Sequence, residues 1–315
     1  MIPDTLLFIL GAGASCPFGL PSGAGLRSVL CRDLRRSTPL SKLVEACGFP
    51  ESTVRNFAYE FLHSGQSSID AFLARRPDFH DVGLHAIAAA LMPSENRDLL
   101  YINPDQDAWG DSNWLGYLWQ RMCLEVNDPK LLPLNTVAFI TFNYDRTVEN
   151  FLQTSIQYTF NLNPDAAQEI VQEFPIFHMY GDLGDYEPGH GYRFGDAVDV
   201  SRIKHAVSRL RVVPNTRPER DHGCEKMISV AKQTVFLGFG FDDMNCHRLA
   251  FQDIKVGDGS KGHTAYATSY GMTDAERHIA KQRVSSTQCE VHMMDDDVDC
   301  LRALREYASL LHVLA

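Results

Sequence analysis

Six short runs of apolar residues recur along the chain, and each ends in glycine or polar residues. Within each run the apolar character is nearly continuous rather than alternating, which is typical of strands covered on both faces of a sheet. The pattern predicts six buried strands at residues 5–13, 136–145, 174–182, 233–243, 263–271 and 289–297.

Segments of helical length lie between or after these runs. They occupy residues 25–36, 145–155, 201–213, 274–284 and 297–314. Strands that alternate with helices of this length favour a doubly wound architecture. We therefore expect an α/β fold, with a Rossmann-like, mostly parallel sheet and helices on both of its faces.

One long stretch, residues 38–133, contains helix-compatible segments and no run that resembles a strand. A chain of 315 residues has room for one domain and a sizeable insertion. The pattern thus predicts a Rossmann-like domain formed by residues 1–37 and 134–315. Residues 38–133 are expected to be a helical insertion that forms a small lid subdomain.

Charge and hydropathy narrow the class of protein. A net charge of −11 argues against a protein whose whole surface binds nucleic acid. The first ten residues include Asp4 and no basic residue, and their apolar run is far shorter than the roughly 20 residues of a membrane span. We expect a cytoplasmic protein without membrane association.

The eight cysteines are scattered and include no CxxC pair, and the histidines show no metal-ligand spacing. Zinc ribbons and thioredoxin-like sites need close-spaced cysteines. We therefore expect no bound metal and thiols without a redox role.

The stretch "FILGAGASCPFGLPSG", residues 8–23, passes from an apolar run through glycines into a helical segment. In this geometry backbone N–H groups and a helix N-terminus can meet a phosphate, and Gly11 and Gly13 allow close approach. The dinucleotide fingerprint fails because Cys16 stands where the third glycine belongs, and no Gly-Lys-Ser/Thr follows. The loop predicts anion binding but not a dehydrogenase, and a tight turn without a ligand is the alternative.

Polar and glycine clusters follow the next three predicted strands. "TFNYD" ends the second run, "FHMYGDLG" the third and "GFGFDDMN" the fourth. Ligands of open α/β sheets bind outside the carboxyl ends of the strands. All of these clusters are therefore expected to face one crevice together with the glycine loop.

The ordered set of motifs resembles the SIR2-like (sirtuin-like) family of NAD-consuming enzymes. The resemblance rests on the GAGAS loop with "GLPSG", the Asn-Tyr-Asp, the His/Gly motif and "GFGFDD", and it runs from about residue 5 to 285. "SIDAFL" (68–73) and "TSYGMTDAERHIAKQ" (268–282) are similar to bacterial members. Protein-deacylating sirtuins carry a four-cysteine zinc module, whereas this chain has a helical insertion instead. The chain therefore resembles the bacterial branch that hydrolyses NAD+.

The resemblance implies catalytic roles for three residues. Asn143 would orient a ribose hydroxyl and a water. The family pattern ends in adjacent His-Gly with the histidine as base, but here Tyr180 precedes Gly181 and His178 lies two positions earlier. Residues two apart in a strand share a face, so we expect both side chains to face the crevice. His178 is favoured as the base, and Tyr180 is the alternative contact to the ribose.

The resemblance also implies a set of residues that bind NAD+ as the substrate. Asp145 is expected either to cap the following helix or to hold Asn143, and Asp242 or Asp243 either to meet a ribose hydroxyl or to cap a helix. Ser22 is expected to touch a phosphate or to cap the helix that follows it. The full predicted set is Gly11, Ala12, Gly13, Ser15, Ser22, Asp145, Gly238, Gly240, Asp242, Asp243 and Asn245.

The leading hypothesis is an NAD+ glycohydrolase that releases ADP-ribose and nicotinamide as an effector of bacterial anti-phage defence. Such an enzyme would be inactive until assembled or activated. The expected activator is a separate subunit: a nucleotide-sensing protein, a HerA-like ATPase or a nucleic-acid-guided sensor, within a homo- or hetero-oligomer. A non-catalytic NAD- or ADP-ribose-binding regulatory subunit is the alternative, and a protein deacylase is disfavoured.

Overall fold

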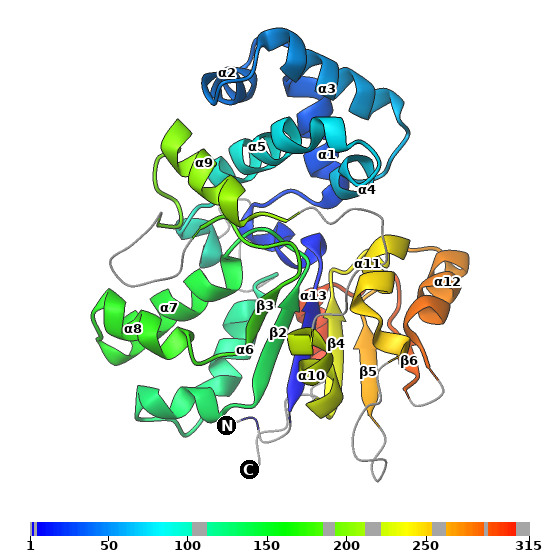
Figure 1. The fold of residues 1–315 in the computed structure, drawn as a ribbon. Coiled ribbons are helices and arrows are strands. Elements are labelled where there is room, and N and C mark those ends of the chain that lie inside the picture. The colour runs from blue at the N-terminus through cyan, green and yellow to red at the C-terminus, as the bar shows by residue number, and fades with distance from the viewer. Residues whose placement is uncertain are drawn as a thin grey trace.

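The computed structural model describes residues 2, 5–102, 112–184, 193–211, 222–253, 263–286 and 289–306. Six parallel strands form one sheet in the order β3-β2-β1-β4-β5-β6 (Figure 1). They are β1 (Leu6–Leu10), β2 (Val137–Thr141), β3 (Ile176–His178), β4 (Gln233–Leu237), β5 (Thr264–Ala267) and β6 (Val291–Met293). Each lies within one of the six apolar runs, so the predicted Rossmann-like α/β fold is confirmed.

The strand order reverses beside β1. The chain builds β2 and β3 on one side of β1 and then returns to place β4, β5 and β6 on the other. Leu10, the last residue of β1, is in register with both Thr141 and Leu237. The carboxyl ends of three neighbouring strands therefore stop at one level, at the switch point where ligands of such sheets bind.

Each face of the sheet is covered by its own apolar core. Leu6, Phe8 and Leu10 face one core and Leu7 and Ile9 the other, as the two-residue alternation of a strand requires. The first core includes α6 (Trp114–Met122), α7 (Thr147–Phe160), α8 (Pro164–Val171) and α13 (Cys300–Glu306). The second includes α9 (Val200–Arg209), α10 (His222–Val230), α11 (Asp243–Leu249) and α12 (Asp274–Val284).

The helices of residues 38–133 lie in two places. Four of them gather with α1 (Gly23–Asp33) beyond the carboxyl ends of the strands, at the top of Figure 1. These are α2 (Pro39–Ala46), α3 (Glu51–His63), α4 (Ile69–Leu73) and α5 (His80–Leu91). They belong to the same apolar core as one face of the sheet, whereas α6 packs beside α13 on the other face.

The helices predicted from the sequence are present where the structure describes the chain. The segments 25–36, 145–155 and 274–284 correspond to α1, α7 and α12, and the parts of 201–213 and 297–314 beyond residues 211 and 306 lie outside the described residues. Within the described ranges, no helix combines the length and the apolar character needed to cross a bilayer.

Candidate functional site

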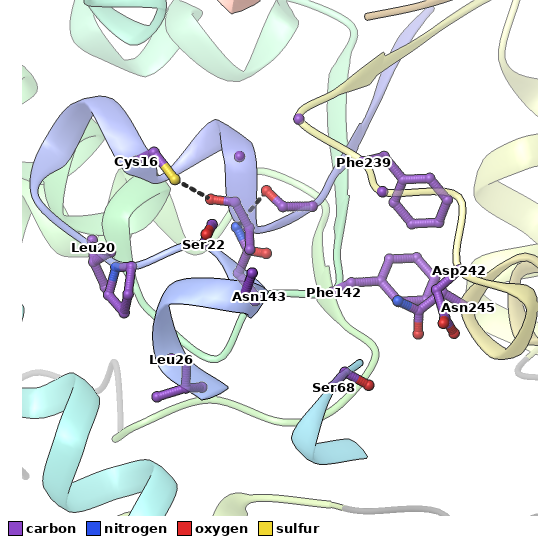
Figure 2. A pocket seen from close by; sticks show the side chains of 18 of the residues that line it. Cys16, Leu20, Ser22, Leu26, Ser68, Phe142, Asn143, Phe239, Asp242 and Asn245 are labelled. Carbon is purple, nitrogen blue, oxygen red and sulfur yellow. Dashed lines mark hydrogen bonds between the residues drawn. The ribbon is translucent and has the colours of Figure 1, made fainter. Parts of the chain in front are cut away.

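A cavity of about 850 Å³ opens at the carboxyl ends of β1, β2 and β4 (Figure 2). Its wall combines the loops that follow the strands with the starts of α1 and α4. Cavities of about 300–1,000 Å³ are typical of small-molecule and cofactor sites. The predicted site residues that line it are Gly11, Ala12, Gly13, Ser22, Asn143, Asp145, Tyr180, Gly238, Gly240, Asp242 and Asn245.

The glycines after β1 and β4 allow two loops to touch through their backbones. Gly11 N–H donates to Leu237 O and Gly13 N–H to Gly238 O, each at 3.0 Å. A Cβ on Gly11 would stand 2.5 Å from Gly238 O, which only glycine avoids. These two N–H groups are therefore committed to the fold, and the glycines shape the cavity through close packing.

The start of α1 offers the backbone donors that the glycines do not. Ser22 caps the helix, because its Oγ accepts Gly25 N–H at 3.1 Å, and Ser22, Gly23 and Ala24 all line the cavity. The first turn of α1 contains no acidic residue. Exposed N–H groups and the positive end of the helix dipole make such a terminus suitable for a phosphate.

Asn143, which follows β2, is held rigidly against the glycine loop. Its Nδ2 donates to Gly11 O at 3.0 Å and to Ser15 Oγ at 2.9 Å, and its own N–H donates to Thr141 Oγ1 at 3.0 Å. The residue is 7% exposed and lines the cavity. Because no described residue donates to Oδ1, this acceptor is available to a ligand.

Asp145 supports both the next helix and Asn143. Its Oδ1 accepts Thr147 N–H, the first of α7, at 3.1 Å, and its carboxylate also bonds the side chain of Ser15. Burial raises the pKa of this carboxyl, and the donors Thr147 and Ser15 oppose the rise. Ser15, which does not line the cavity, therefore connects Asp145 to the Asn143 amide.

His178 does not line the cavity, contrary to the expectation that it faces the crevice beside Tyr180. Its Nδ1 lies 3.2 Å from Asn143 O, and its Nε2 lies 2.6 Å from Glu149 Oε1. Burial opposes the charged ring, but the Glu149 carboxylate, together with Asp182 and the Asn143 carbonyl, outweighs it and raises the pKa of His178 to about 9. The shared-face argument fails because β3 ends at His178, so the alternation of a strand does not reach Tyr180.

Tyr180 lines the cavity as a neutral hydrogen-bond donor. Its hydroxyl donates to Asn245 Oδ1, and the Arg248 guanidinium lies 4.7 Å from the centre of its ring. Burial, with a further contribution from Asp70, raises the pKa of Tyr180 well above its usual value of about 10. The phenol is protonated at neutral pH and cannot act as a base there.

The two aspartates of "GFGFDD" have separate places. Asp242 lines the cavity and caps α11, because its Oδ1 accepts Met244 N–H at 3.0 Å. Asp243 is exposed, lies 3.5 Å from the Arg283 guanidinium and does not line the cavity. Of the two alternatives for a ribose contact, the geometry leaves Asp242.

Comparison with known proteins finds one family model that matches part of this arrangement. Residues 137–287, from β2 to beyond α12, match the family model of the SIR2-like domain. These residues therefore resemble a SIR2-like domain. A mutant Sir2 homologue in complex with 2′-O-acetyl ADP-ribose is similar to it at 10% identity and a TM-score of 0.35, over 98% of this chain and 94% of that one. No curated protein matches the chain.

The cavity also contains polar residues to which the sequence assigned no role. Asp70 of α4 and Tyr144 both line it, and the Tyr144 hydroxyl donates to Asp70 Oδ1. Thr268, after β5, lines it as well and accepts Gly238 N–H at 2.9 Å. Two features of the sequence could have indicated these residues. Asp70 lies in "SIDAFL", and Thr268 lies at the end of a predicted strand.

The described side chains were also compared with the groupings that bind metal ions. In the part of the chain that the structure describes, no three His, Cys, Asp or Glu side chains are grouped so that they could hold a metal ion.

Proposed function

We propose that the SIR2-like domain binds NAD+ in the 850 Å³ cavity and hydrolyses its N-glycosidic bond to ADP-ribose and nicotinamide. The observation that carries this proposal is the fixed position of the Asn143 side chain in the cavity wall. Three hydrogen bonds hold its backbone and amide nitrogen at the switch point of the sheet, and its Oδ1 has no donor among the described residues. A fixed acceptor at this place can orient a ribose hydroxyl and a water without losing side-chain entropy on binding.

The surroundings of Asn143 suit the charges of the substrate and of the transition state. The N-terminus of α1 suits the pyrophosphate, as a helix start without acidic residues favours an anion. Breaking the glycosidic bond develops positive charge on the ribose, and carboxylates in the cavity wall, such as Asp242, stabilise such charge.

Replacement of Asn143 tests this role. We expect Asn143→Ala to lower nicotinamide release from NAD+ by about 100-fold, because the ribose and water lose their orientation. Release is measured by chromatography. Asn96→Ala is the matched control, since Asn96 is exposed and outside the cavity. Equal release by the wild type and Asn143→Ala would exclude Asn143 from the reaction.

We further propose that the hydrolase is a defence effector with low basal activity, which rises when it is assembled with or activated by a separate sensor subunit. Its resemblance to NAD-hydrolysing members of the family supports this role, because uncontrolled loss of NAD+ would kill the host cell. The test compares NAD+ hydrolysis by the purified chain alone and together with the product of a neighbouring gene. An increase with the second protein is expected, and equal rates would contradict control by that partner.

Two observations favour a second candidate, a regulatory module that holds NAD+ or ADP-ribose without cleaving it. His178 is engaged outside the cavity, and Tyr180, which does line it, is a neutral donor. Calorimetric binding of NAD+ without nicotinamide release, alone and with a partner, would support this candidate over the hydrolase.

A further inference from the structure

Four aspartates line the cavity, and three of them accept a backbone N–H at the start of a helix. Asp145, Asp242 and Asp299 each accept a backbone N–H at the start of α7, α11 or α13, at 3.1, 3.0 and 2.7 Å. A carboxylate that caps a helix is stabilised in its charged form and fixed in orientation. These three carboxylates are therefore already engaged in holding the starts of helices.

The fourth aspartate, Asp70, is not needed as a cap. The helix α4 is capped by Ser68, whose Oγ accepts Ala71 N–H at 3.2 Å. The Asp70 carboxylate instead accepts the Tyr144 hydroxyl and its own backbone N–H. Because Tyr144 follows Asn143 in the chain, this bond ties the carboxylate to the loop that carries the Asn143 amide.

The groups around Asp70 adjust its proton affinity. Burial raises the pKa of the carboxyl, and Asp242 adds to the rise. The Tyr144 hydroxyl and the Arg248 guanidinium act in the opposite direction and keep the charged form accessible. A general base works best when its pKa lies closer to the working pH than that of an exposed aspartate.

We propose that Asp70 is the general base of the NAD+ hydrolysis proposed above, on which this inference rests. A water oxygen forms a bond to C1′ of the nicotinamide ribose, while the C1′–N bond breaks and its electron pair passes to the nicotinamide nitrogen. One proton of that water goes to the Asp70 carboxylate and then to solvent. No oxidant or further reactant is needed, and His178, with both ring nitrogens engaged, takes no part.

Chemical rescue tests this role. We expect Asp70→Ala to lower kcat for nicotinamide release by about 100-fold, with KM changed far less. Sodium azide, a nucleophile that needs no deprotonation, should restore release and give ADP-ribosyl azide, detected by mass spectrometry. Asn143→Ala should not be rescued, because orientation is lost there. The isosteric Asp70→Asn should match Asp70→Ala without azide, and its thermal unfolding shows whether the fold is kept.

The control and the outcomes separate this inference from the proposed function. Asp165→Asn changes an exposed carboxyl outside the cavity and should leave release unchanged. Equal release by the wild type and Asp70→Ala would overturn the base role alone. So would a folded, NAD-binding Asp70→Ala that azide does not rescue. Intact NAD+ after prolonged incubation with excess wild-type protein, both alone and with the product of the neighbouring gene, would overturn the proposed function, and the base role with it.

Discussion

The imidazole of His178 lies between two acceptors, the Asn143 carbonyl at 3.2 Å and the Glu149 carboxylate at 2.6 Å. Only a ring that carries protons on both nitrogens can donate to both. The side chains of His178 and Glu149 are 10% and 12% exposed, so the pair is a nearly buried ion pair beneath the Asn143 loop. Its role is to hold that loop in place.

This ion pair predicts a pH dependence of stability. The pKa of His178 is raised from 6.5 to about 9 in the folded protein, so the folded state keeps a proton that the unfolded state loses first. The stabilisation is complete below about pH 6.5 and is lost as pH rises through 9, by about 3 kcal/mol in the free energy of unfolding. Urea denaturation from pH 6 to 9 measures it. In His178→Gln the free energy of unfolding should change much less over this pH range. The same pH dependence in this variant and the wild type would contradict a stabilising ion pair between His178 and Glu149.

The loops after β1 and β4 act as one structural element because they meet backbone to backbone. Gly238 has a φ of +57°, and a Cβ on it would stand 2.1 Å from Ala14 N. The contact sets the spacing between β1 and β4 at the switch point, where the cavity opens. The shape of the cavity therefore depends on this glycine contact.

Substitution of Gly238 tests the contact. We expect Gly238→Ala to lower the free energy of unfolding by at least about 2 kcal/mol, because both the positive φ and the clash oppose the side chain. Gly240→Ala is the matched control: a Cβ on Gly240 would meet no heavy atom within 4 Å, so a change within about 0.5 kcal/mol is expected. Both variants are measured by chemical denaturation. Equal losses in the free energy of unfolding would contradict a stabilising role for the contact between the two loops.

The elements were more predictable than the site. Each strand could be found because burial on both faces requires a continuous apolar run, and the place of Asn143 at the cavity because it lies at the end of such a run. His178 was misplaced because the sequence does not show that β3 ends at this residue. Asp70 had no assigned role because its partner Tyr144 is 74 positions away, and such pairs depend on how α4 packs over the sheet.

At the scale of the whole molecule, the cavity joins parts of the chain that are far apart in sequence. The loops after the strands form its floor, and α1 and α4 contribute from the group of helices beyond them. These helices and one face of the sheet share a single apolar core, so both sides of the cavity are fixed by packing. A preformed cavity loses little ordering entropy when a ligand binds.

Hydrolysis in this cavity is tested by a single-turnover reaction of excess purified wild-type chain with NAD+, alone and with the product of the neighbouring gene, followed by mass spectrometry. We expect nicotinamide and ADP-ribose in equal amounts, formed about 100-fold more slowly when Asn143→Ala replaces the wild type. NAD+ recovered intact from the wild-type reaction would contradict hydrolysis in this cavity.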